Sequence, residues 1–326
     1  MKFFVMIYAY RDLELPKTVN NIFAMADNPE DINIGIINAD DEDFNFKWNK
    51  YKKQVKVKNV NYKEYHGCGR ACHEILTELY DNEEYVIKID PHTRFAKGWD
   101  SYYSQFIKPD RVIVSRCLGY DTDGTLDKEE TAYSKPIGWH DVQVIELQGT
   151  QYKGIEKEIF FFNAGFFIAP ASWVKDVGYD PHIAMWGEEA DLSCRTFLKG
   201  YKMINVPSKV YHLYGRKNRK SVDTSAEFER LNRLGIERAK LKIGLIGPRP
   251  ELMAEWDKYG CDGKTYKDKM NSLFAQIEAE KTEKAADMGY KPESVVICNH
   301  CGSKTFFKDG KCKWCYKDLI GSAITD

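Results

Sequence analysis

The sequence predicts an α/β fold built on a mixed, mainly parallel sheet, followed by a helical segment and a small terminal domain. The stretch FFVMIYAY, at residues 3–10, is apolar throughout and is typical of a buried central strand. Residues 18–29 have helical spacing and end at a proline, and INIGIIN at residues 32–38 is typical of a second buried strand. A strand, a helix and a strand in this order imply a parallel sheet with right-handed crossovers.

The later part of the chain continues this alternation. Further strands are expected at residues 54–62, 85–90, 111–117, 158–170 and 202–215, and further helices at 69–84 and 186–201. From about residue 221 to residue 290 the pattern is helical and charged, with a break at GPRP, residues 247–250. We therefore expect an α/β domain at residues 1–220, a helical extension at 221–290 and a small domain at 291–326.

Composition limits the classes of protein to consider. The chain has 326 residues, of which 43% are hydrophobic, so it can bury a substantial core. Its formal net charge of -1 argues against a protein that coats nucleic acid by charge alone. No apolar run approaches the ~20 residues that a bilayer requires, so we expect no membrane association and a cytoplasmic location. Nine cysteines without an export signal favour reduced thiols or metal ligands.

Four of these cysteines form a pattern near the C-terminus. Cys298 and Cys301 make one C-x2-C pair, and Cys312 and Cys315 make a second pair after ten residues. Two such pairs bring four thiolates to a tetrahedral zinc ion, and no position remains open for a substrate. The sequence therefore predicts a structural Zn²⁺ ion in a terminal zinc ribbon, which would need the metal to fold.

A polar pair stands at the end of one expected strand. In YVIKIDPH the apolar run stops at Asp90, and His92 follows two residues later. Ligands of open α/β sheets bind at the carboxyl ends of strands. One carboxylate and one imidazole suit a cation such as Mn²⁺. The alternative is that Asp90 caps a turn before Pro91 and that His92 is merely exposed; taken alone, the pair is a weak motif.

Six stretches in a fixed order strengthen this interpretation. They are YAYRD (8–12), GCGRA (67–71), IKIDPHTRFAKGWD (87–100), NAGFFIAP (163–170), YDPH with WGEEADLSCRTFLKGY (179–201) and VYHLYGR (210–216). In this order they resemble the cytosolic protein-hydroxyproline N-acetylglucosaminyltransferases and, more broadly, the GT-A-type glycosyltransferases. The resemblance covers about residues 1–220. Pro91 stands where the family has serine, and the zinc ribbon is an addition that opens the question of the acceptor.

The resemblance implies a GT-A-type, Rossmann-like fold, a UDP-sugar donor and retention of configuration at the sugar. Mn²⁺ (or Mg²⁺) would be held by Asp90, His92 and His212. Donor or nucleotide binding would fall to Tyr10, Arg11, Arg70, Asp90, Gly165 and Trp186. Catalytic roles would fall to Glu188, Glu189 and Asp191. The alternative for the glutamates is that they are ordinary acids in the first turn of a helix, where the dipole favours them.

The expected ribbon bears on the acceptor. It interleaves basic and aromatic residues: Lys304, Lys308, Lys311, Lys313 and Lys317 with Phe306, Phe307, Trp314 and Tyr316. Cations track phosphates and rings stack on bases, although some of these rings must form the core of the ribbon. The pattern favours a hydroxymethylated base in DNA, as in phage-type DNA modification, in which case the protein would act in the host cytoplasm. The alternative acceptor is a hydroxyproline, or another hydroxyl, on a protein.

Two rival classes of function remain. One is a non-catalytic module that binds nucleic acid or protein, and the other is a nucleotidyltransferase that acts on sugars. Asp90, His92, His212 and the Glu188–Glu189 pair favour an enzyme over a module. The sugar is left open among N-acetylglucosamine, which follows from the resemblance, glucose, and a pentose such as arabinose.

Overall fold

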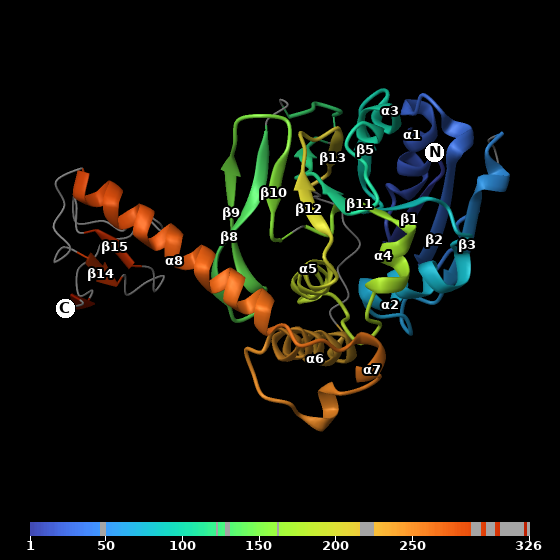
Figure 1. Cartoon of the computed structure of the whole chain (residues 1–326). Helices are drawn as coiled ribbons and strands as arrows, with labels where there is room; N and C mark the ends of the chain where they lie inside the picture. The colour runs from blue at the N-terminus through green and yellow to red at the C-terminus, as the bar shows by residue number, and fades with distance from the viewer. Residues whose placement is uncertain are drawn as a thin grey trace. The chain divides into compact units, whose positions relative to one another are not determined.

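The computed structural model describes residues 1–45, 50–121, 123–127, 131–161, 163–215, 225–287, 295–297, 304–306 and 323–324. The chain divides into two compact units, Met1–Met270 and Asn271–Asp326 (Figure 1). Among the described residues, no helix is long and apolar enough to cross a membrane.

An eight-stranded sheet forms the centre of the first unit. Its strand order is β10-β12-β6-β11-β4-β1-β2-β3. The strands are β1 (Phe3–Tyr10), β2 (Ile32–Ala39), β3 (Val55–Val60), β4 (Tyr85–Ile89), β6 (Arg111–Val114), β10 (Lys157–Ile159), β11 (Phe166–Pro170) and β12 (Lys202–Asn205). Strands β4, β1, β2 and β3 are parallel to one another, and β12 is parallel to β6. Because β11 and β10 run antiparallel to their neighbours, the sheet is mixed and mainly parallel, as expected.

Both faces of the sheet are covered, and β1 shows how. Phe3, Val5 and Ile7 belong to one core together with helices α1 and α3. Phe4 and Met6 point to the opposite face and join a second core with α2 and α4. A strand that is buried on both faces has to be apolar at successive positions, which is why residues 3–10 show no alternation of polarity. The helices of the first unit are α1 (Leu15–Met25), α2 (Cys68–Glu74), α3 (Trp99–Ser104), α4 (Ala171–Asp176), α5 (Glu188–Leu198), α6 (Ala226–Ile243) and α7 (Trp256–Tyr259), with 3-10 turns η1 (Pro29–Asp31), η2 (Lys52–Gln54) and η4 (Pro250–Leu252).

Two expected strands are each divided in two. Residues 158–170 form β10 and β11, which lie at different places in the sheet. Residues 202–215 form β12 and a separate strand, β13 (Val210–His212), with Pro207 between them. Proline has no backbone N–H to donate to a neighbouring strand, so a continuous strand is disfavoured there.

The helices also differ in detail from expectation. Helix α1 begins at Leu15, three residues before the expected start, with Pro16 in its first turn. The missing N–H of proline costs nothing at that position. The helix expected at residues 69–84 is α2 followed by a π-helical turn, η3 (Ile75–Leu79).

A second, small sheet carries part of the candidate site. It contains β5 (Thr93–Phe95), β13 and β7 (Leu118–Gly119), in the order β5-β13-β7. Its register places His212 opposite Thr93 on one side and Gly119 on the other. A hairpin of β8 (Ala132–His140) and β9 (Val144–Gln151) precedes β10 and was not expected from the sequence.

The helical pattern after residue 221 is confirmed for the described residues. Helix α6 packs on α5, and the break expected at 247–250 lies between α6 and η4. Helix α8 (Lys264–Asp287) spans the boundary of the two units. In the second unit, β14 (Val295–Ile297) pairs antiparallel with β15 (Lys304–Phe306) and with β16 (Ala323–Ile324). Cys298, Cys301, Cys312 and Cys315 lie outside the described residues.

Candidate metal centre and active site

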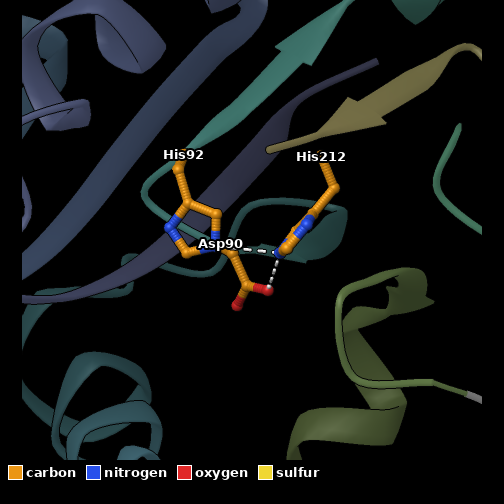
Figure 2. Close-up of side chains that lie close together, drawn as sticks. All are labelled: Asp90, His92 and His212. Carbon is orange, nitrogen blue, oxygen red and sulfur yellow. Dashed lines mark hydrogen bonds and ion pairs between the residues drawn. The ribbon is translucent and has the colours of Figure 1, made fainter. Parts of the chain in front are cut away.

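Three side chains converge where strands β4 and β13 end. The Nε2 atoms of His92 and His212 are 2.8 Å apart, and Asp90 Oδ2 lies 3.1 Å from His212 Nε2 (Figure 2). One ligand atom from each of the three residues lies within 4.8 Å of the others, and we call these three residues the Asp90 cluster. The structure therefore brings together the three residues that the sequence singled out as metal ligands.

Strand pairing explains how residues 120 positions apart meet. Asp90 follows the last residue of β4, and His92 precedes β5 by one residue. Strand β13 pairs antiparallel with β5, with His212 opposite Thr93, so His212 is delivered beside His92. The two imidazole rings meet nearly edge to face, with centroids 4.4 Å apart.

Asp12 fixes the orientation of His92. Its Oδ2 lies 2.9 Å from His92 Nδ1, and both side chains are almost fully buried. An ionised carboxylate can only accept, so Nδ1 carries the proton and Nε2 presents a lone pair to the cluster. Burial lowers the pKa of His92, which keeps the ring neutral near pH 7 although Asp12 acts in the opposite direction. Asp12 lies within the YAYRD stretch but was not expected to be a site residue.

Lys88 orients Asp90, as Asp12 orients His92. Its ammonium group donates to Asp90 Oδ1 at 2.8 Å, and the lysine side chain is only 7% exposed. Burial alone would raise the pKa of Asp90, but Lys88 and His212 hold it well below its usual range. Lys88 therefore keeps Asp90 ionised and occupies Oδ1, which leaves Oδ2 directed at His212. The sequence signal was a lysine between two isoleucines in an otherwise apolar strand.

The donor set fits a divalent cation. Two imidazole nitrogens and a carboxylate oxygen point at one small volume, and both His92 Nε2 and Asp90 Oδ2 are electron-rich acceptors. A cation between them would relieve their mutual repulsion. Mixed nitrogen and oxygen ligation of this kind suits Mn²⁺ better than Ca²⁺.

The N-terminus of α5 lies beside this cluster. Glu189 accepts a 2.7 Å hydrogen bond from the backbone N–H of Ala164, the residue before Gly165. A Cβ atom added at Gly165 would lie 3.9 Å from Asp90 Oδ2, so this glycine borders the cluster directly. Burial raises the pKa of Glu189 to about 7. The neighbouring Glu188 is buried, its carboxylate contacts the Cys68 thiol, and burial raises its pKa as well.

Asp191 has different surroundings from the two glutamates. Both of its oxygens are engaged, with Arg195 in a two-point contact and with Lys242 of α6 at 2.7 Å. Lys242 also binds Asp180 at 2.5 Å, and Asp180 binds Arg238 at 2.6 Å. These five side chains are buried, so Asp191 joins α5 to α6, and the geometry does not present it to the Asp90 cluster.

The nucleotide residues expected at the end of β1 lie together. Arg11 follows Tyr10 with a φ of 47°, an uncommon value for a residue other than glycine. Its guanidinium lies 4.3 Å from the centre of the Tyr62 ring and 3.0 Å from Asp41. Tyr10 meets the same Tyr62 ring edge-on at 6.0 Å. The carboxyl ends of β1, β2 and β3 thus form an aromatic and cationic surface at the edge of the sheet that also carries Asp90.

Arg70 and Trp186 are the most exposed of the expected donor residues. The Arg70 side chain is 49% exposed, pairs with Glu74 and lies over the ring of Tyr65. Trp186 is 42% exposed, and its backbone N–H donates to Asn232 of α6. Gly187, which follows it at φ 91°, lets α6 approach closely, because a Cβ there would lie 3.0 Å from the Cβ of Ala239.

The chain matches the model of a known protein family. The family described as Glycosyltransferase (GlcNAc) matches residues 2–45 and 42–272. The chain belongs to this family. The prediction of a glycosyltransferase is therefore confirmed, and the GlcNAc glycosyltransferase family match spans every residue of the Asp90 cluster.

Solved structures with a related arrangement include TarS of S. aureus. A 1-349 form in complex with UDP-GlcNAc is 13% identical and covers 96% of this chain and 98% of its own, with a TM-score of 0.47. The complex of the same form with UDP has the same identity and coverage and a TM-score of 0.44. No curated protein matches the chain. UDP-GlcNAc and UDP are the ligands of TarS in those complexes, and at this level of similarity we do not assign them to this chain.

Proposed function

We propose that this GlcNAc-family glycosyltransferase transfers a sugar from a UDP-sugar to a hydroxyl group on a macromolecule, with retention at the anomeric carbon. The convergence of Asp90, His92 and His212 at the carboxyl edge of the sheet is the observation that carries the proposal. These three residues would offer a site for a cation between the surface around Arg11 and the N-terminus of α5.

The three ligands would hold a divalent cation, with Mn²⁺ the best fit to two nitrogens and one oxygen. When bound, such an ion neutralises the charge of a diphosphate leaving group. The protein contributes preorganisation. Asp12 fixes the tautomer of His92, and Lys88 holds Asp90 ionised, so the ligands need little rearrangement to bind.

The donor would lie along the edge of the sheet. Tyr10, Arg11 and Tyr62 offer stacking and a guanidinium group to a nucleotide at the end of β1. Gly165 has no side chain, so a sugar can approach Asp90 from β11. The family description favours N-acetylglucosamine as the sugar.

Glu189 is the strongest of the expected catalytic residues. Its hydrogen bond to Ala164 places its carboxyl group beside Gly165, where the reacting sugar would lie. With a pKa of about 7 it can hold or release a proton near neutral pH. We assign Glu188 to orientation of this end of α5, because it is buried against Cys68, and we assign Asp191 to the packing of α6.

For the acceptor, a hydroxymethylated base in DNA remains the preferred proposal, with a protein hydroxyl as the alternative. Support comes from the basic and aromatic residues of the expected zinc ribbon, whose Zn²⁺ would be held by Cys298, Cys301, Cys312 and Cys315. The base would have to be single-stranded or flipped out of its helix to reach the Asp90 cluster.

The test is release of UDP from a panel of UDP-sugars, with Mn²⁺, in the presence and absence of hydroxymethylated DNA. We expect release that depends on Mn²⁺ and is stimulated by hydroxymethylated but not by unmodified DNA. Asp90→Ala and His212→Ala should abolish release, because each removes a ligand but little packing. His140→Ala is the matched control, since that exposed histidine caps the turn of the β8–β9 hairpin.

The outcomes separate the parts of the proposal. Normal turnover in both Asp90→Ala and His212→Ala would contradict the metal assignment. Release without stimulation by DNA would keep the transferase and return the acceptor to a protein hydroxyl.

A further inference from the structure

A polar pocket adjoins the candidate active site. It lies on the side away from the surface of Tyr10, Arg11 and Tyr62, which we call the nucleotide surface because the nucleotide is proposed to bind there. Its volume is about 490 Å³, within the range of small-molecule sites. It is lined by Arg116, Cys117, Leu118, Gly119, Asp127, Ala132 and Tyr214. None of these residues is among the binding, catalytic or metal residues expected from the sequence, although Tyr214 lies in the VYHLYGR stretch.

The pocket is contiguous with the metal cluster. The ring of Tyr214 lies 4.3 Å from the ring of His212, centroid to centroid. Cys117 Sγ and Asp90 Oδ2 both border Gly165, at 3.8 and 3.9 Å from the Cβ that this residue lacks. A group bound in the pocket would therefore sit next to a sugar held over Gly165.

The order of the strands indicates what the pocket would bind. Along the sheet, β2 and β1 carry the nucleotide surface, β4 carries Asp90, β11 follows Gly165, and β6 comes next and leads into Arg116. In this order, the proposed positions for nucleotide, metal and sugar precede the pocket. The remaining reactant is the acceptor, so the pocket lies at the acceptor end of the site.

Three side chains give the pocket an aromatic ring, a guanidinium group and a carboxylate: Tyr214, Arg116 and Asp127. Tyr214 is 63% exposed, and its hydroxyl donates to the backbone oxygen of Cys117 at 3.1 Å, which holds the ring in place. The Arg116 guanidinium lies over Gly149 of β9, where an added Cβ would come within 3.2 Å of Nη1. Asp127 is fixed by Gly119, whose N–H donates to its Oδ2 at 2.7 Å.

The ring, guanidinium group and carboxylate of this pocket suit the binding of a pyrimidine base better than the binding of a peptide. Unstacked bases are held by aromatic rings and by the planes of arginine guanidinium groups, which Tyr214 and Arg116 offer on one pocket. A carboxylate accepts from the exocyclic amino group of cytosine, and Asp127 keeps accepting capacity beyond its bond to Gly119. Arginine can also donate two parallel hydrogen bonds to a phosphate or a base oxygen.

We propose that this pocket is the acceptor subsite and that it receives a single unstacked cytosine-type base, with Tyr214 and Arg116 as its binding residues and Asp127 as its specificity-determining residue. The inference rests on the proposed function, because it takes the acceptor to be a base hydroxyl. It goes further by naming the residues that would tell this acceptor from a protein.

The experiment measures transfer to a single-stranded oligonucleotide that carries 5-hydroxymethylcytosine. The variants are Arg116→Ala and Tyr214→Ala, with Arg116→Lys and Tyr214→Phe as conservative partners. We expect the KM for the oligonucleotide to rise ~10-fold or more in both alanine variants, since stacking on one base is worth that much. Tyr214→Phe should lie closer to wild type than Tyr214→Ala, because it keeps the ring and loses only the hydrogen bond to Cys117. Arg116→Lys should be intermediate because it keeps only the charge.

A second readout separates the pocket from the donor site. The dissociation constant for UDP with Mn²⁺, measured by calorimetry, should move far less than the oligonucleotide KM in all four variants. Arg230→Ala is the control arginine, because it is exposed on α6 and pairs only with Glu227 among the described residues. It should leave both quantities unchanged.

Two results would overturn the inference in distinguishable ways. If wild type modifies the oligonucleotide and both alanine variants keep its KM, the proposed function stands and the pocket assignment fails. If wild type modifies a hydroxyproline peptide and not the oligonucleotide, the base acceptor itself is wrong and the pocket assignment falls with it.

Discussion

At the scale of single residues, the proposed metal ligands depend on partners that would not touch the metal. Asp12 is the clearest case, because its contact with Nδ1 of His92 leaves Nε2 to face the cluster. Asp12→Asn should weaken Mn²⁺ binding by about 10-fold, within the range found when such outer partners are changed. Titration of free Mn²⁺ by electron paramagnetic resonance measures this.

The control for Asp12 is Asp27→Asn, since Asp27 is exposed and, among the described residues, forms an ion pair only with Lys97. Mn²⁺ affinity should be unchanged there. Equal affinity in wild type and in Asp12→Asn would mean that His92 is not a ligand or does not need this orientation.

Glu189 makes stability depend on pH. Its pKa is about 7 when folded and near 4.5 in the unfolded chain, so between these values the folded state binds a proton that the unfolded state does not. This contribution is fully present below pH 4.5 and is lost as pH rises through 7. The difference corresponds to about 3 kcal/mol as an upper limit. Urea unfolding of the metal-free protein at pH 5 and pH 8 measures it.

Glu189→Gln isolates this effect, because glutamine keeps the acceptor for Ala164 and cannot ionise. Wild type should lose stability relative to Glu189→Gln between pH 5 and pH 8. A constant difference between the two proteins over that range would show that Glu189 has an ordinary pKa.

The sequence revealed the residues that touch the site more readily than those that orient them. Asp90 and His92 were singled out because they follow an apolar strand, and His212 because the VYHLYGR stretch resembles a known family. Asp12 and Lys88 were not, since an acid after a strand and a lysine inside one each have many ordinary explanations. Asp191 was expected to share the role of the glutamates, but it lies two residues after Glu189, about 200° around α5, and there it forms ion pairs with Arg195 and with Lys242 of α6.

At the scale of elements, buried charges join α5 to α6. Lys242 is fully buried and binds both Asp180 and Asp191. Lys242→Met keeps the length of the side chain but leaves two buried carboxylates short of a cation. We expect a loss of about 3 kcal/mol in the free energy of unfolding, at the low end for a broken buried pair because Arg238 and Arg195 remain. Urea denaturation measures it.

The same helix supplies the control for Lys242. Arg230→Ala removes an exposed pair with Glu227, which solvent already screens, and should cause no measurable loss of stability. If Lys242→Met were as stable as Arg230→Ala, the buried network would not hold the two helices together.

Element predictions were reliable where the local pattern was long. Strand β1 was expected at residues 3–10 and has those bounds. Strands β5 and β13 have three residues each, too few to show a period, and they form only because they pair across the chain. The β8–β9 hairpin was missed because its residues are mostly half-exposed and polar, with Pro136 inside the first strand.

At the scale of the whole molecule, two metal centres are expected in different units. The Asp90 cluster lies in Met1–Met270, and the four cysteines of the expected ribbon belong to Asn271–Asp326. Each unit has its own sheet, so loss of one centre need not remove the other. If the second unit binds the acceptor, loss of its zinc should lower the affinity for the acceptor and leave donor binding intact.

The double substitution Cys298→Ser with Cys301→Ser tests this division. Elemental analysis should find one zinc per wild-type chain and none in the variant, because two of four thiolates are gone. Mn²⁺-dependent UDP binding should persist, while KM for a hydroxymethylated oligonucleotide should rise about 10-fold or more. Cys261→Ser, in the first unit, is the control and should keep its zinc. Zinc retained by the double variant would rule out the ribbon, and donor and acceptor binding lost together would show that the second unit supports the fold of the first.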